Sequence, residues 1–119
     1  MKRILIVEDN EKNMYLISFL LKKNGYEVLE AWTGEEGVEL AIKERPDLII
    51  MDIQLPGIDG LEATKRIRES EADGKIPIVA LTSYAMTGDR EKALNAGCTG
   101  YLEKPIDPET FIGEIEKHL

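Results

Sequence analysis

Residues 47–57 read Asp-Leu-Ile-Ile-Met-Asp-Ile-Gln-Leu-Pro-Gly, and this stretch carries the strongest indication of the fold. Its apolar run is continuous rather than alternating, which is typical of a strand in the middle of a sheet covered by helices on both faces. Asp52 closes the run, where a lone carboxylate is costly unless it is paired or binds a metal. Pro56 and Gly57 then favour a turn. We therefore predict a buried strand over residues 47–51, followed directly by a functional carboxylate.

Four further apolar runs predict strands, and stretches with helical periodicity separate the five runs. The predicted strands cover residues 3–7, 27–31, 47–51, 78–81 and 100–102. The helical stripes consist of Met14, Ile17, Leu20 and Leu21; of Val38, Ala41 and Ile42; of Leu61, Thr64 and Ile67; of a stretch over residues 89–96; and of Phe111, Ile112, Ile115 and Leu119. The pattern predicts an α/β protein with five strand–helix units in one domain over residues 1–119.

Residues that begin or end helices mark the boundaries of these units. Gly25 and Gly97 follow the first and fourth helical stretches as stop residues. Pro46 ends the second stretch, because the residue before a proline avoids helical geometry. Asp107 is the expected N-cap of the last helix, with Pro108 at its first helical position. No repeat, low-complexity segment or linker interrupts this order.

Parallel strands joined by helices connect through right-handed crossovers, which produces an open, doubly wound parallel sheet. For five strands we predict the order 2-1-3-4-5, which places the topological switch point between the first and third strands. Ligands bind at such a point, outside the carboxyl ends of the strands. Glu8, Asp9 and Asp52 follow the first and third predicted strands. Topology and chemistry therefore indicate the same place.

The loop after the first predicted strand is acidic and contains no glycine. A nucleotide-binding fold of this shape would have a glycine-rich turn there to bind phosphate through backbone amides. Taken by themselves, Glu8 and Asp9 would be an ordinary polar loop. Together with Asp52 they predict a divalent cation site, because neighbouring carboxylates repel each other unless a cation compensates them. Mg²⁺ suits such a site, since it prefers carboxylate oxygens and bridges to phosphate.

Two further residues complete the predicted site. Thr82 directly follows the fourth predicted strand and would place a hydroxyl beside a phosphoryl oxygen. Lys104 follows the fifth and would supply a positive charge for phosphate. Separately, Thr82 could be a strand-end turn residue and Lys104 a solvated charge. Jointly with Asp52, which can attack phosphorus and form an acyl phosphate, they indicate phosphoryl chemistry on an aspartate.

The composition excludes some classes of partner. The chain has 119 residues and a net charge of −8, from 15 Lys and Arg against 23 Asp and Glu. Binding to nucleic acid needs clustered Lys and Arg, and the basic residues here are scattered among acids. No transmembrane run or signal peptide is visible, so we expect a cytoplasmic protein that does not contact membranes. The single Cys98 is expected to be a buried thiol.

Four motifs resemble the receiver domain of the two-component response regulators, the CheY-like family, and the likeness covers essentially the whole chain. The motifs are Val7-Glu8-Asp9-Asn10, Met51-Asp52-Ile53-Gln54-Leu55-Pro56, Ala80-Leu81-Thr82-Ser83 and Tyr101-Leu102-Glu103-Lys104-Pro105. The intervals from Asp52 to Thr82 and from Thr82 to Lys104 also match the family's spacing. The wording of the motifs and of residues 85–89 and 96–98 is similar to DivK-type single-domain regulators, and to receivers attached to hybrid histidine kinases.

The resemblance implies a role for each matching residue. Asp52 would accept a phosphoryl group from a phosphohistidine on a sensor histidine kinase or histidine phosphotransfer protein. Asp9, Asp52 and the backbone carbonyl of Gln54 would bind Mg²⁺, and Glu8 would act through water. Glu8 stands where the family often has Asp, which leaves direct or water-mediated coordination open. Gln54 and Tyr84 would influence how water reaches the acyl phosphate.

The same resemblance implies a phosphoacceptor switch rather than an enzyme, with autocatalytic phosphotransfer and autodephosphorylation activity. Thr82 and Lys104 would bond the phosphoryl oxygens, and Lys104-Pro105 would be a cis peptide. Tyr101 would swing inward as the aromatic switch residue. The surface formed by the helix over residues 89–96, the strand over 100–102 and the last helix would change most and meet the downstream target protein.

Three rival functions fit the residues less well. A haloacid dehalogenase-type phosphatase has a second Asp two residues after its nucleophile, where this chain has Gln54. Flavodoxin-like cofactor binding would need a phosphate cradle in the first loop. A binding module that never carries phosphate would be expected to lack the acidic pair, Asp52 or Lys104.

Several properties stay open at the level of sequence. We expect a single-domain regulator that signals through protein contacts, but a receiver excised from a longer regulator or hybrid kinase would read the same. The sequence does not reveal the cognate kinase, the downstream target, the lifetime of the phosphate or the oligomeric state.

Overall fold

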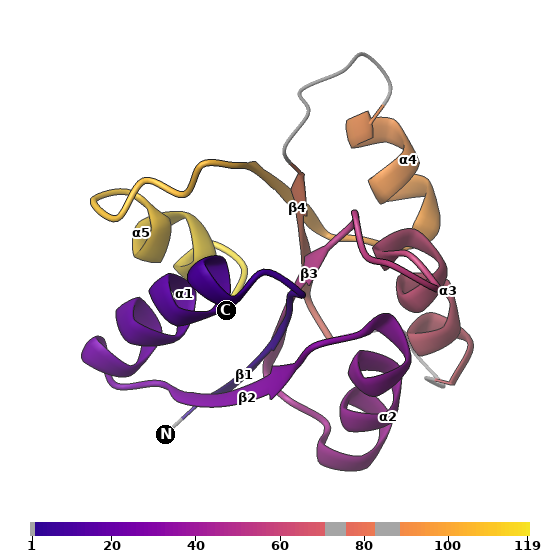
Figure 1. Ribbon diagram of the computed structural model, residues 1–119, viewed down its shortest axis with the longest axis horizontal. Coiled ribbons are helices and arrows are strands. Elements are labelled where there is room, and N and C mark those ends of the chain that lie inside the picture. Colours follow the sequence, from indigo (N-terminus) through magenta and orange to yellow (C-terminus); the bar gives the residue numbers. More distant parts are fainter. Residues whose placement is uncertain (1, 71–75, 83–88) are drawn as a thin grey trace.

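The computed structural model describes residues 2–70, 76–82 and 89–119. Within these residues five strands form one parallel sheet in the order β2-β1-β3-β4-β5 (Figure 1). The strands are β1 (Arg3–Val7), β2 (Glu27–Ala31), β3 (Leu48–Asp52), β4 (Ile78–Thr82) and β5 (Gly100–Glu103). The helices are α1 (Glu11–Lys23), α2 (Gly34–Glu44), α3 (Gly60–Ser70), α4 (Asp89–Ala96) and α5 (Phe111–Glu116). The predicted fold class and strand order are confirmed.

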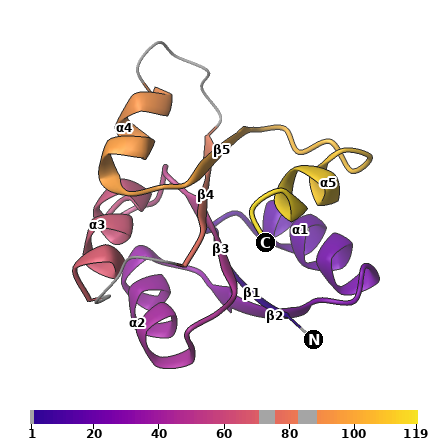
Figure 2. The ribbon, with the colours of Figure 1, turned by 180° about the vertical axis from the view of Figure 1, so that it is seen from behind.

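Helices cover both faces of the sheet. Figures 1 and 2 show α1 and α5 on one face and α2, α3 and α4 on the other. Because successive strand side chains point to opposite faces, each strand contributes to two separate cores. Leu5 and Val7 belong to the core under α2, α3 and α4, whereas Ile4 and Ile6 belong to the core under α1 and α5.

The middle strands are buried along their whole length, as the continuous apolar runs predict. Every residue of β3 and β4 is buried. Full burial of one such aliphatic side chain contributes about 1.5–3 kcal/mol, so these strands supply much of the free energy of folding. The polar residues that end them, Asp52 and Thr82, are therefore held in place by a rigid apolar frame.

Local capping explains where the first helices begin and end. The Asn10 side chain accepts a hydrogen bond from the backbone N–H of Asn13 at the start of α1, and Thr33 caps α2 in the same way. Gly25 and Gly97 follow α1 and α4 with φ of 89° and 115°, a conformation that glycine adopts without strain. Both predicted stop residues are confirmed.

Some expectations about element boundaries and faces differ from the structure. Asp52 and Thr82 belong to β3 and β4 rather than following them, because the sheet hydrogen bonds continue past the apolar runs: Asp52 is paired with Leu81. The regular part of α5 begins at Phe111, not at residue 108, because residues 108–110 form a turn. The expectation that Ile42 lies on the buried stripe of α2 is wrong: Ile42 is 50% exposed, and small residues bury that helix against the sheet.

Asp107 nevertheless makes the hydrogen bonds of a cap. Its Oδ1 atom accepts from the backbone N–H of Glu109 at 2.9 Å. Its carbonyl oxygen accepts from the N–H groups of Thr110 and Phe111. The turn is thus a tightened entry into α5. Among the described residues, no helix has the length and apolar character needed to cross a membrane.

Candidate functional site

The residues singled out at the strand ends lie together at the carboxyl edge of the sheet. Glu8 and Asp9 follow β1, and Asp52 ends β3. Thr82 ends β4, and its carbonyl oxygen accepts a hydrogen bond at 2.7 Å from the backbone N–H of Lys104, which follows β5. Since the parallel strands end in register at this edge, residues far apart in the chain converge on one place.

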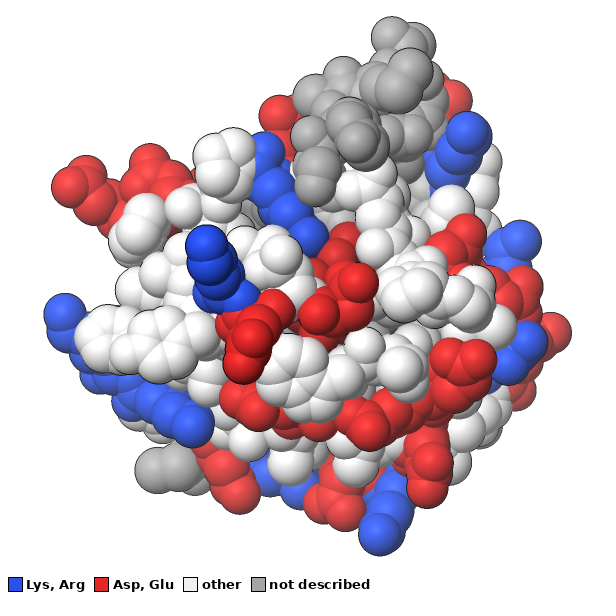
Figure 3. Space-filling model, viewed as in Figure 1, with Lys and Arg blue, Asp and Glu red and all other residues white. Residues whose placement is uncertain are grey.

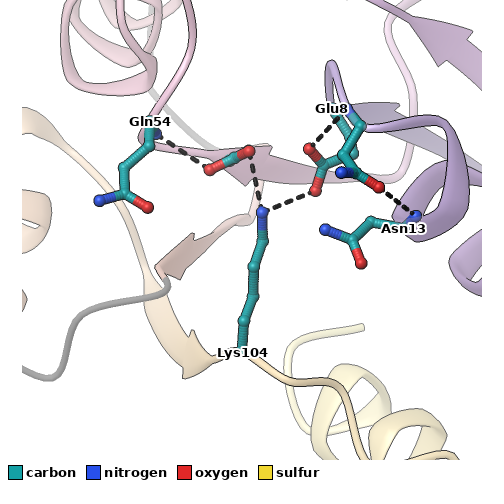
Figure 4. A network of polar contacts seen from close by, with 6 residues as sticks. Glu8, Asn13, Gln54 and Lys104 are labelled. Atoms are coloured by element: carbon teal, nitrogen blue, oxygen red, sulfur yellow. Dashed lines mark hydrogen bonds and ion pairs between the residues drawn. The ribbon is translucent and has the colours of Figure 1, made fainter.

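Lys104 lies at the centre of this site. Its ammonium Nζ is 2.9 Å from Oδ2 of Asp52 and 2.9 Å from Oε1 of Glu8 (Figure 4). All three side chains are largely withdrawn from water, with exposures of 12% for Lys104, 2% for Asp52 and 0% for Glu8. Hydrogen-bonded ion pairs between groups this buried are strong, because little water screens them.

The Asp52 carboxylate is held from both sides. Its Oδ1 accepts a hydrogen bond from the backbone N–H of Gln54 at 2.9 Å, while Oδ2 accepts from Lys104. Gly60, the first residue of α3, packs directly on the backbone of Asp52: a Cβ atom at Gly60 would lie 2.2 Å from the Asp52 carbonyl oxygen. The carboxylate is thus oriented toward the site by the loop after β3 and by the start of α3.

Glu8 is the buried member of the acidic pair. Its Oε2 accepts a hydrogen bond from the backbone N–H of Asn10 at 3.1 Å. Its Oε1 lies at ion-pair distance from Lys104 but lacks a directed hydrogen bond among the described residues. Burial and the neighbouring Asp52 raise the pKa of Glu8 to about 7, although Lys104 and the Asn10 amide oppose the shift. In a site without a cation, Glu8 therefore holds a proton more readily than an ordinary glutamate.

The pKa of Lys104 is raised. Burial by itself would lower the pKa of its ammonium group, because a charge is less stable away from water. Hydrogen bonds and charge attraction from Glu8 and Asp52 outweigh that effect and raise the pKa. The ammonium charge is thus a permanent part of the site.

The donor set fits a divalent cation of the magnesium type. Glu8, Asp9 and Asp52 each offer a carboxylate oxygen, and these oxygens lie within 4.8 Å of one another. Asp9 is exposed whereas the other two are buried, so one side of the cluster opens to solvent. Hard oxygen donors with water on the open side are what Mg²⁺ prefers, and the Glu8 oxygen without a directed hydrogen bond could be satisfied in this way.

Thr82 and Tyr101 belong to β4 and β5. Thr82 is fully buried. Tyr101 is half-buried and packs against the core under α2, α3 and α4. The Lys104-Pro105 peptide is cis, as the resemblance implied. Tyr84 lies outside the described residues.

Two asparagines belong to the site although the sequence analysis assigned them no separate role. Asn10 donates its backbone N–H to Glu8 and caps α1 with its side chain. Asn13, on the first turn of α1, lies beside Glu8 and Lys104 at the mouth of the site in Figure 4. The sequence offered one signal for the role of Asn10: it is a residue type that favours helix N-caps, and it directly follows the acidic pair.

Known proteins resemble this chain over nearly its whole length. A family model described as the response regulator receiver domain matches residues 4–116. The polar-differentiation response regulator DivK of Brucella anthropi is 45% identical over 118 residues, which cover 99% of this chain and 96% of that protein. The structure of chemotaxis protein CheY4 of Vibrio cholerae matches with a TM-score of 0.94 at 33% identity, covering 100% of this chain and 99% of that one.

One solved relative bears on the cation site. The receiver domain of the sensor histidine kinase PA1611 of Pseudomonas aeruginosa PAO1 is 40% identical, with a TM-score of 0.89 and coverage of 98% of this chain and 95% of that chain. That domain was solved with a magnesium ion coordinated in its active site cleft. The acidic cluster formed by Glu8, Asp9 and Asp52 is of a kind that binds such an ion.

Proposed function

This chain belongs to the response regulator receiver domain family, and from that premise we propose that Asp52 is its phosphoacceptor. The chain is a receiver domain of the two-component type, a signalling switch. One observation carries the assignment of Asp52: a buried carboxylate at the end of a central strand has one oxygen on Lys104 and the other on a backbone amide. A carboxylate oriented in this way can attack phosphorus without reorganising its surroundings.

The proposed reaction transfers a phosphoryl group from a phosphohistidine of a partner protein. An Asp52 oxygen forms the new O–P bond, the N–P bond of the donor breaks, and the imidazole keeps the electron pair. Lys104, already bonded to Asp52, would offset the charge on the phosphoryl oxygens, and Thr82 would donate its hydroxyl to one of them. Positioning and charge neutralisation are the main contributions that a protein makes to phosphoryl transfer.

A magnesium ion would be held by Asp9, Asp52 and the backbone carbonyl of Gln54, with Glu8 acting through water. Bound there, the ion would supply positive charge opposite the phosphoryl oxygens. The residues of this chain fit that role because their carboxylates converge while Asp9 stays open to solvent. Glu8, whose pKa is raised to about 7, would be favoured in its ionised form beside the cation.

Phosphorylation would change the conformation of one surface of the domain, and this change would be the output of the switch. Phosphoryl contacts to Thr82 and Lys104 would be available mainly in the active arrangement, so phosphorylation would shift the population toward it. We expect Tyr101 to move inward with Thr82 and the face of α4, β5 and α5 to change most. A sensor histidine kinase or histidine phosphotransfer protein would be the donor, and a downstream protein would read that face.

Hydrolysis of the acyl phosphate by water would reset the switch, and Gln54 would influence the approach of water. This autodephosphorylation, the cytoplasmic location and the single receiver domain over residues 1–119 stay predictions.

Intact-protein mass spectrometry after incubation with acetyl phosphate and Mg²⁺ tests the assignment. We expect the gain of one phosphoryl group, its loss in Asp52→Asn, and its loss when the metal is chelated. Asp59→Asn is the matched control: Asp59 caps α3 by accepting from the Glu62 N–H, and asparagine caps equally well. A phosphoryl group retained in folded Asp52→Asn would overturn the assignment.

A further inference from the structure

We propose that the surface groove between α3 and α4 binds an acidic segment of a partner protein, at a place separate from the carboxyl-edge site. The groove, called here the α3–α4 groove, has a volume of about 270 Å³. It is lined by Leu61, Lys65, Lys92, Asn95 and Ala96. Neither its lysines nor its apolar residues take part in the proposed phosphoryl chemistry.

Two printed side-chain contacts join α3 to the residues that directly follow α4. The two helices lie side by side in Figures 1 and 2. Arg68 of α3 donates from Nε to the carbonyl oxygen of Gly97 at 2.9 Å. The aliphatic part of the Arg68 side chain occupies the space that a Cβ atom at Gly97 would need. Thr64 contacts the Cys98 thiol at 3.7 Å. Ala93 of α4 belongs to the same buried core as Ala63 and Ile67 of α3, so the groove is a hollow on the surface beside this packed seam.

The charges around the groove point to an acidic ligand. Lys65 and Lys92 are exposed, and neither makes an ion pair with any residue in the described ranges. The nearby Glu62 is already engaged, since it accepts from Arg66 at 3.0 Å. Figure 3 shows acidic side chains over much of the face in view, which fits the net charge of −8. Two unpaired ammonium groups on such a molecule attract carboxylates selectively.

The floor of the groove indicates that the ligand also carries an apolar group. Leu61 packs against the core, and Ala96 is buried. An apolar side chain lying over them would be removed from water, while carboxylates beside it reach the lysines at the rim. A nucleic acid would need more phosphate contacts than two lysines provide, and anionic membranes are recognised by clusters of about four to eight basic residues. A protein segment is therefore the favoured occupant.

The test is a titration followed by ¹⁵N–¹H NMR at low ionic strength. The probe is a blocked octapeptide of aspartates and glutamates around two central leucines. We expect shifts centred on the residues that line the α3–α4 groove. Because exposed ion pairs at the rim each contribute modestly, reversing both charges should weaken binding about tenfold. A peptide with serines in place of the leucines should bind several-fold more weakly.

Two double variants make the outcome decisive. Lys65→Glu with Lys92→Glu should weaken binding about tenfold. Lys2→Glu with Lys12→Glu changes the net charge equally at exposed sites elsewhere and should leave the affinity nearly unchanged. Asp52→Asn should bind the peptide normally, so this test stands apart from the proposed phosphorylation. Equal weakening in both double variants, or shifts gathered on another surface, would overturn the proposal. Binding of polyuridylate or anionic vesicles through Lys65 and Lys92 without peptide binding would overturn it too.

Discussion

The Lys104 ammonium lies 2.9 Å from an oxygen of Asp52, although 52 positions separate the two residues in the chain. The sheet brings them together, because β3 and β5 flank β4 and all three end at the same edge. The same ammonium contacts Glu8, which follows β1. One cation thus neutralises two carboxylates that are almost completely withdrawn from water.

Removing that cation should destabilise the fold. We expect Lys104→Met to lower the free energy of unfolding by about 3 kcal/mol in urea titrations without Mg²⁺, since loss of one partner leaves buried charge uncompensated. Adding Mg²⁺ should restore part of the loss by replacing the missing positive charge. Lys117→Met, which removes an exposed ion pair with Glu114, should change stability by less than about 1 kcal/mol. Equal effects of the two substitutions would contradict this account of the site.

Asp9 should matter for the cation and not for the fold. We expect Asp9→Ala to weaken Mg²⁺ binding at least about tenfold by calorimetry, and to leave unfolding unchanged or slightly improved because a like charge is removed. Phosphorylation should fall together with metal affinity. Glu11→Ala, an exposed acid two residues further on, serves as the control and should leave the affinity nearly unchanged. Unaltered Mg²⁺ affinity in Asp9→Ala would refute the role of Asp9 as a ligand.

The raised pKa of Glu8 predicts how stability depends on pH without metal. The folded protein binds the Glu8 proton more tightly than the unfolded chain, because the pKa rises from 4.5 to about 7 on folding. This contribution to stability is complete below pH 4.5 and is lost as the pH rises through about 7. As the pH rises from about 5 to 8, the urea midpoint of the wild type should therefore decrease relative to that of Glu8→Gln. A constant difference between the two proteins over that range would show that Glu8 does not titrate there.

Adding Mg²⁺ to the same urea titrations should make this pH-dependent change of the wild-type midpoint smaller, since a cation favours the ionised carboxylate. The control is the same series of titrations with Mg²⁺ removed by a chelator.

The contact of Gly60 with the backbone of Asp52 predicts opposite effects for two glycine substitutions. A Cβ atom at Gly60 would lie 2.2 Å from the Asp52 carbonyl oxygen and 2.5 Å from the Cα of Ile53, and backbone atoms cannot yield cheaply. We expect Gly60→Ala to cost at least about 2 kcal/mol. A Cβ atom at Gly113 in α5 would meet no described residue within 4 Å, so Gly113→Ala should stabilise by about 0.5–1 kcal/mol through helix propensity. Thermal unfolding measures both, and a neutral Gly60→Ala would contradict the close packing.

Hydrophobic patterns and strand-end residues along the chain predicted the five strands, their order in the sheet and the edge where the site lies. They were less informative where packing between elements decides the outcome. Ile42 matches the apolar period of α2 but is half exposed, because Gly34, Gly37 and Ala41 form the buried face and let the helix approach the sheet closely. At Gly37 a Cβ atom would lie 2.7 Å from a methyl group of Val7. Small residues gave a weaker hydrophobic signal than the isoleucine did.

The boundaries of β3 and β4 show the same limit. The apolar runs predicted strands that stop before Asp52 and Thr82, whereas sheet pairing carries both residues into the strands. Hydrogen bonds between strands depend on register, which hydrophobicity reveals only in part.

The order of residues was sufficient to predict the alternation of strands and helices and the helix stops at Gly25 and Gly97. It also predicted the strand-end positions of Glu8, Asp9, Asp52, Thr82 and Lys104. These features follow from local periodicity and backbone preference. Only the tertiary structure decided that Lys104 bonds Asp52 and Glu8 together, that Glu8 is buried with a raised pKa, and that α3 and α4 leave a lysine-rimmed groove. Those features depend on distances and solvent exclusion between segments remote in the chain, which arise only once the sheet has assembled and its helices have packed.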